Sequence, residues 1–240
     1  MKTSASNKTR VIAVIALSLL ASTFGTQFAQ AASPNRYISV SSTGTVKVTP
    51  DAVRLNASVS AIAKVSKDAL TSANIAADKF RTAILANGID KKNLASTTLT
   101  VYPEYNYTQE GGNVLIGYRA SQSFEVIIRN AAKAGEIIDA VVASAGDALY
   151  INGVTPFVFT HSKATEAARI SAVKNAKAKA NSYAKLLGVK IGKIINLQES
   201  SAPSSYPISM VQAKSDAGAT QIDLGQQDIS VSVSTKWAIS

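Results

Sequence analysis

The pattern that most constrains the fold of this 240-residue chain is a pair of strand-like segments separated by a short tip that contains two glycines. Residues 94–107, LASTTLTVYPEYNY, have the composition of a β-strand, and residues 114–130 alternate in the same way. The short tip between them contains Gly111 and Gly112, a hairpin signal. One face of the return strand consists of Tyr118, Ala120, Gln122, Phe124, Val126 and Ile128. Two strands joined by so short a tip are antiparallel, so we expect an antiparallel sheet.

Further segments with the period of a strand lie on both sides of this hairpin. In residues 37–50, Gly44 is a turn or bulge candidate, so this segment is predicted to be a strand pair or one bent strand. Gly153 marks a break inside the strand-like segment at residues 149–160. These segments cover residues 37–50, 51–64, 149–160, 193–200 and 226–240.

Three segments change to the period of a helix. The first begins at Ser66, a candidate N-cap, and ends at Gly88. The second covers residues 131–146, and the third runs from about Ser162 to Leu187. The resulting order, β-β-α-β-β-α-β-α-β-β, predicts an α+β fold of antiparallel sheets with helices packed on one face. We expect two subdomains, with the first helix and its hairpins in one and the later helices with the last strands in the other.

The first 31 residues have the features of a Sec-type signal peptide. Lys2, Lys8 and Arg10 precede an apolar run of about a dozen residues, and Ala29 and Ala31 provide an A-x-A cleavage pattern. The alternative, a membrane anchor, needs about 20 apolar residues. We therefore expect export, with residues 32–240 as the mature chain and no later transmembrane segment. Because the sequence contains no cysteine, a lipoprotein anchor and disulfides are both excluded.

Three motifs in order resemble the SIMPL family, formerly a domain of unknown function (DUF541) found in exported bacterial proteins. The first places Gly44, Val46, Pro50, Asp51 and Leu55 in an opening pattern; the second is GYRASQSFEV, on Gly117, Tyr118, Ala120, Phe124 and Val126; the third is YAKLLGVKIG, with Gly188 and Gly192. The resemblance spans about residues 37–240. It implies an α+β fold of two subdomains, a tendency to self-assemble, similarity to periplasmic immunogenic proteins, and no established catalytic residues. We expect one SIMPL-like domain over residues 32–240, with a soft internal boundary near 125–150 and a flexible Ser/Ala/Pro-rich loop at 199–220.

The residues that enzymes use are scarce. There is no cysteine, and His161, the one histidine, lies at the start of the third helix without a G-x-S-x-G elbow near any serine. Glu136 and Asp139 share a helix face but have no third ligand nearby, so we read them as a solvated face. We therefore expect no catalytic residues, no cofactor and no metal site. A hydrolase with an unmarked pair of carboxylates is the least favoured alternative.

The segment that contains the third helix, residues 161–194, carries the net positive charge of the mature chain. The formal charge is +10, of which three belong to the signal peptide, and residues 161–194 hold eight basic residues and one acidic residue. A stripe of apolar residues predicts that this helix packs on a sheet: Ile170, Val173, Ala176, Ala180, Tyr183 and Leu187. Its other side is a candidate polyanion-binding face made of Lys174, Lys177, Lys179 and Lys185. Nucleic acid is disfavoured, because the helix has no arginine cluster or aromatic platform.

The central hairpin is rich in tyrosine. Tyr102, Tyr105, Tyr107 and Tyr118 form a candidate interaction hairpin, with ordinary cross-strand packing as the equal alternative. The sequence thus predicts an exported, non-catalytic protein that forms a homo-oligomer and acts in envelope maintenance or stress tolerance. A binding module for an anionic envelope polymer is the alternative.

Overall fold

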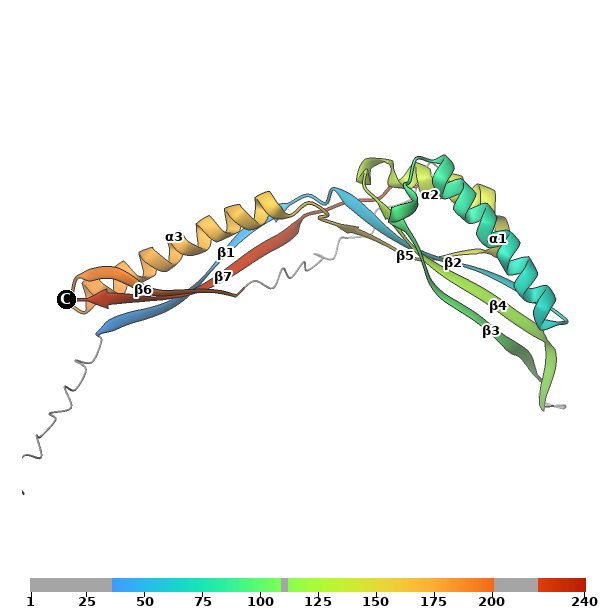
Figure 1. Ribbon diagram of the computed structural model, residues 1–240, viewed down its shortest axis with the longest axis horizontal. Helices are drawn as coiled ribbons and strands as arrows, with labels where there is room; N and C mark the ends of the chain where they lie inside the picture. Colours follow the sequence, from blue (N-terminus) through green and yellow to red (C-terminus); the bar gives the residue numbers. More distant parts are fainter. Residues whose placement is uncertain (1–35, 109–111, 201–219) are drawn as a thin grey trace, which may run out of the picture. The chain divides into compact units, whose positions relative to one another are not determined.

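A computed structural model describes residues 36–108, 112–200 and 220–240 (Figure 1). The expected signal peptide, Gly111 at the hairpin tip and residues 201–219 of the expected loop lie outside the described residues. The order of strands and helices is the one expected from the sequence. The strands are β1 (Tyr37–Val48), β2 (Ala52–Ala63), β3 (Leu94–Thr108), β4 (Gly112–Ile128), β5 (Leu149–Phe157), β6 (Ile191–Ser200) and β7 (Gln227–Ile239). The helices are α1 (Ser66–Ala86), α2 (Ala134–Ala145) and α3 (Ser162–Leu186).

One antiparallel sheet has the strand order β3-β4-β2-β5 and carries α1 and α2 on one face (Figure 1). The alternation in β2 and β4 buries their apolar face as expected, with Leu55 and Phe124 in the core under the helices. Phe124 stacks on Phe80 of α1 with ring centroids 4.7 Å apart. A strand that is apolar on one side only needs cover on that side only, which explains why helices occupy one face.

The other antiparallel sheet has the order β1-β7-β6 and is covered on one face by α3 (Figure 1). The fold is therefore α+β with two sheet-and-helix layers. The distribution of elements differs from the expected one, because β1 pairs with β7 and α2 packs beside α1. Period-two alternation shows that a segment is a strand but does not identify its partner.

Residues 125–150, where a soft boundary was expected, include the end of β4, all of α2 and the start of β5. All three belong to the layer built on the four-stranded sheet.

Two local expectations are wrong. β1 is one continuous strand whose register with β7 has no shift, so Gly44 is neither a turn nor a bulge. Helix α1 has Val65, with no side-chain cap, at its N-cap position, and Ser66 is its first helical residue. Gly88 does follow the end of α1 with a φ of 81°, a left-handed conformation that glycine adopts without strain.

Two polar side chains hold the segments that connect the strands. Asp51, between β1 and β2, accepts hydrogen bonds from the backbone N–H groups of Phe159 (2.6 Å) and Thr160 (3.3 Å) just before α3. Gln227, at the start of β7, accepts from the N–H of Val158 and donates to the carbonyl of Pro156. These bonds satisfy backbone groups at the end of β5 and just before α3.

Candidate functional site

The buried stripe of α3 consists of alanines alone. Ala168, Ala172, Ala176, Ala180 and Ala184 are buried at every fourth position, against β1 and β7. The expected stripe of bulkier residues is wrong in part, since Ile170 is 61% and Leu187 65% exposed. The reason is steric, because only small side chains let the helix approach the sheet as closely as it does at Gly44.

The four candidate lysines do not have equal roles. Lys174, Lys177 and Lys185 are exposed, and Lys179 donates from Nζ to the carbonyl of Ser41 on β1 (3.2 Å). Within the described ranges, none of the four forms an ion pair; the cation of α3 that does is Arg169, held by Glu166 and Glu199. These carboxylates raise the pKa of Arg169 above its ordinary value. The lysine face therefore carries uncompensated positive charge, and its binding of a polyanion stays a prediction.

Lys179 also helps to protect an exposed sheet edge. Among the described strands, β7 is the one that pairs with β1. Asn175, one helical turn before Lys179, donates to the carbonyl of Thr43 (3.3 Å). An unpaired strand edge is a template for association, and native proteins often cover such edges. The pair Asn175 and Lys179 does so for part of β1.

The structure does not bring the four tyrosines of the hairpin together. Tyr102 lies opposite Arg119 on the sheet face away from the helices, whereas Tyr105 and Tyr107 alternate with it on the helix-side face. Tyr118 is half-buried against the alanines of α1. An interaction hairpin made of all four residues is thus divided between two faces, and its role stays a prediction.

Sequence reasoning missed the residues that lie in one row with Tyr105 and Tyr107. Four exposed side chains form a row along the helix-side face of the edge strand β3: Leu99, Val101, Tyr105 and Tyr107. We call these residues the β3 row. The signal available in the sequence was their spacing, since every second residue from 99 to 107 is apolar, proline or aromatic.

Catalytic groups are not gathered in the described part of the chain. No group of three His, Asp or Glu residues there could hold a metal ion. His161 is exposed at the N-cap position of α3 without a side-chain cap. Asp139 is not a free ligand on a solvated face, because it accepts hydrogen bonds from the N–H (2.9 Å) and hydroxyl (2.5 Å) of Thr220, which lower its pKa.

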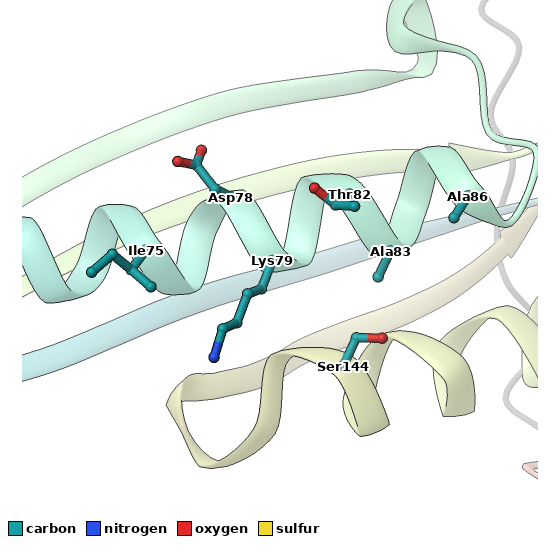
Figure 2. A pocket seen from close by; sticks show the side chains of 7 residues that line it. All are labelled: Ile75, Asp78, Lys79, Thr82, Ala83, Ala86 and Ser144. Carbon is teal, nitrogen blue, oxygen red and sulfur yellow. The ribbon is translucent and has the colours of Figure 1, made fainter.

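A groove of about 630 Å³ lies between α1 and α2 (Figure 2). Figure 2 shows the side chain of Lys79 reaching toward α2, while that of Asp78 points away from it. Asp78 is paired with Arg81 (2.9 Å). The lining residues are Ile75, Asp78, Lys79, Thr82, Ala83, Ala86 and Ser144. This set has one carboxylate, already paired, and no histidine, so it has no acid–base pair for hydrolysis.

In the described residues, no helix is both long enough and apolar enough to span a bilayer.

Comparison with known proteins gives a consistent family. Residues 38–237 match the family described as SIMPL, a protein of unknown function (DUF541). The chain is similar to the 26 kDa periplasmic immunogenic protein of Brucella melitensis biotype 1, with 30% identity over 216 residues, 84% of each chain. It is also similar to the uncharacterized protein YggE of Edwardsiella ictaluri, with 29% identity over 163 residues, 68% of this chain and 67% of the relative. YggE of Escherichia coli K12 is 30% identical over 154 residues, 63% of this chain and 62% of the relative. With its motifs at Gly44, Gly117 and Gly188 in this order and a family match over nearly all described residues, the chain belongs to the SIMPL family.

Proposed function

We propose that this is an exported, non-catalytic protein that assembles with copies of itself through the edge of β3 and acts in envelope maintenance or stress tolerance. The β3 row carries the proposal, because four large apolar or aromatic side chains are exposed together on one strand edge. Contiguous exposed apolar surface of this kind marks interaction sites in soluble proteins.

The position of the β3 row favours a second copy as the partner. β3 pairs with β4 on one side, and its other edge presents backbone groups that no other described strand pairs with. Two copies of β3 placed side by side would satisfy these groups and bring their β3 rows together. β1 contrasts with β3, since Asn175 and Lys179 bond to its carbonyls.

Export and the absence of catalysis have separate support. A relative similar over 84% of its length is named periplasmic, and the first 31 residues have the pattern of a signal peptide. The groove between α1 and α2 has no acid–base pair.

Light scattering coupled to size-exclusion chromatography of residues 32–240 tests the assembly. We expect an oligomer at micromolar concentration and a monomer for Val101→Lys, which places a charge in the centre of the β3 row. Ile75→Lys, at a similarly exposed position on α1, is the matched control and should still assemble. A monomeric parent chain contradicts self-assembly, and an oligomer that persists in Val101→Lys contradicts the β3 edge as its interface.

A second candidate function is binding of an anionic envelope polymer by α3. The observation that favours it is the absence of an ion pair at Lys174, Lys177, Lys179 and Lys185 within the described residues. Such a local field attracts polyanions. We expect retention on a heparin column that falls when all four are replaced by Gln. The same number of exposed lysines on the four-stranded layer provides the control: Lys67, Lys79, Lys91 and Lys133. Equal loss of retention in both variants would show that retention depends on net charge alone, and this result would contradict a binding face on α3.

A further inference from the structure

The four-stranded sheet has a second face, opposite the one that α1 and α2 cover (Figure 1). We call it the outer face. The strand registers place polar side chains from several strands on this face, together with tyrosine rings from β3 and β5. Its central members are Ser58 and Ser60 from β2, Tyr102 and Glu104 from β3, Arg119, Ser121 and Ser123 from β4, and Tyr150 from β5.

The polar groups at the centre of the outer face are already fixed by one another. Arg119 donates from Nε and Nη2 to the two carboxylate oxygens of Glu104, at 2.9 Å each. Its remaining terminal nitrogen, Nη1, donates to the hydroxyl of Ser60 (3.2 Å), which also accepts from Ser121 (2.9 Å). Both charged side chains are about a quarter exposed, so solvent or a ligand reaches them. Donors and acceptors held in this way lose little conformational entropy when they bind a ligand.

Two exposed tyrosines flank this network. Tyr102, 45% exposed, lies directly opposite Arg119, and Tyr150, 50% exposed, lies opposite Ser58. The strand order places them three strands apart, about 14 Å across the sheet. They are also offset along the strands, since Tyr150 aligns through Ser58 with Ser123 rather than with Arg119.

The charges of the outer face select the kind of ligand. Arg119 is paired with Glu104, and Arg54 with Glu125 (3.4 Å). These two pairs therefore offer an anionic polymer no net positive charge at the centre of the outer face. A second protein chain would find hydroxyls where interface cores are apolar. A neutral saccharide combines apolar C–H faces with hydroxyls, which matches tyrosine rings beside a fixed network of donors and acceptors.

We propose that the outer face binds a neutral, extended glycan. Sugar rings lie on the exposed rings of Tyr102 and Tyr150, and sugar hydroxyls bond to Arg119, Glu104 and the serine hydroxyls between them. Because the two tyrosines are diagonally placed, one glycan that touches both must span several sugar rings. An extended β-1,4-linked chain has the straight shape that a sheet surface accommodates.

Glycan binding does not depend on the proposed self-assembly. The β3 row lies on the helix-side face, and the outer face is on the opposite side of the same sheet. A variant of the outer face should therefore keep the oligomeric state of the parent chain. Loss of assembly in Val101→Lys would likewise leave glycan binding by the separated chain measurable.

Saturation-transfer difference NMR with chitohexaose and cellohexaose, using residues 32–240, tests the proposal. We expect a signal from at least one of the two hexasaccharides. Tyr102→Ala and Tyr150→Ala should each weaken binding about three- to tenfold, whereas Tyr102→Phe, which keeps the ring, should stay close to the parent chain. Tyr37→Ala is the matched control, because Tyr37 is 47% exposed but lies on β1 of the other sheet.

The results of these experiments either support or overturn glycan binding by the outer face. No signal from either hexasaccharide at millimolar concentration overturns the proposal, as does binding that both Tyr→Ala variants retain. Equal weakening by Tyr37→Ala shows that the glycan does not use the outer face. A circular dichroism spectrum that matches the parent chain confirms folding of each variant, and Arg119→Lys, which cannot form the bidentate bond to Glu104, gives a second measure in which we expect weaker binding.

Discussion

Gly44 on β1 and Ala168 on α3 lie so close together that no side chain fits between them. A Cβ atom on Gly44 would be 2.1 Å from the carbonyl oxygen of Ala168 and 2.3 Å from the backbone nitrogen of Ala172. The glycine that opens the family motif is therefore the place where helix and sheet backbones touch. It also explains why the stripe that α3 presents to the sheet is made of alanines.

Gly44→Ala is expected to destabilise the three-stranded layer by about 3 kcal/mol, the upper part of the range for overpacking, because the obstructing atoms are backbone. Urea unfolding followed by circular dichroism measures this. Gly153→Ala, in β5, is the control, since a Cβ there meets no atom within 4 Å. Equal stability of the two variants would contradict the close contact.

Ala176→Leu tests the alanine stripe itself. Ala176 is fully buried at the middle of α3, so the larger side chain must push the helix from the sheet, and we expect a loss of about 1–3 kcal/mol. Ala178→Leu, at an exposed position on the same helix, should change the unfolding free energy by less than about 0.5 kcal/mol. A greater loss at Ala178 than at Ala176 would mean that another face of α3 packs on the sheet.

Phe124→Ala is expected to cost about 3–5 kcal/mol, the range for removal of a buried aromatic ring. The ring stacks on Phe80 and has the guanidinium of Arg81 5.0 Å from its centroid. Thermal unfolding is the measurement, with the half-exposed Tyr183→Ala as a comparison expected to have little effect. A small change for Phe124→Ala would show that the core under α1 is not tightly packed.

Asp139 predicts a pH dependence of stability. The hydrogen bonds from Thr220 lower its pKa in the folded protein, so the carboxylate stabilises the fold above the unfolded-state pKa of about 3.9. This contribution is lost as the pH falls through the lower folded-state pKa. We therefore expect Asp139→Ala to be less stable than the parent chain at pH 7, with a difference that shrinks below about pH 3.9. Urea unfolding at several pH values measures the difference, and one that stays constant down to pH 2.5 would contradict the role of ionised Asp139.

The order of strands and helices and the α+β class could be predicted from the sequence, because hydrophobic period and glycine punctuation are local properties. The apolar faces of β2 and β4 were also correct, since Val, Leu, Ile and Phe contrast with serine there. The pairing of β1 with β7 could not be predicted, because a bond such as that between Ser41 and Ser234 joins residues 193 positions apart.

The packing face of α3 was predicted poorly for a different reason. Alanine is abundant on this helix, so hydrophobic contrast pointed to bulky residues such as Ile170 and Leu187, which the structure leaves in solvent. The packing face depends on the distance between helix and sheet, and the sequence of one helix does not give that distance. The network around Arg119 was missed because it needs the registers of three strands, although the alternation of Arg119, Ser121 and Ser123 was visible.

The pairing of β1 with β7 also sets the order in which the molecule can be completed. A chain that emerges N-terminus first releases β1 first and β7 last of the described strands, whereas the described strands of the other sheet are finished by Phe157. Contacts so distant in sequence form slowly. The four-stranded layer can therefore close while β1 still waits for its partner, and a chain that stops before Gln227 leaves its first strand without the strand it pairs with.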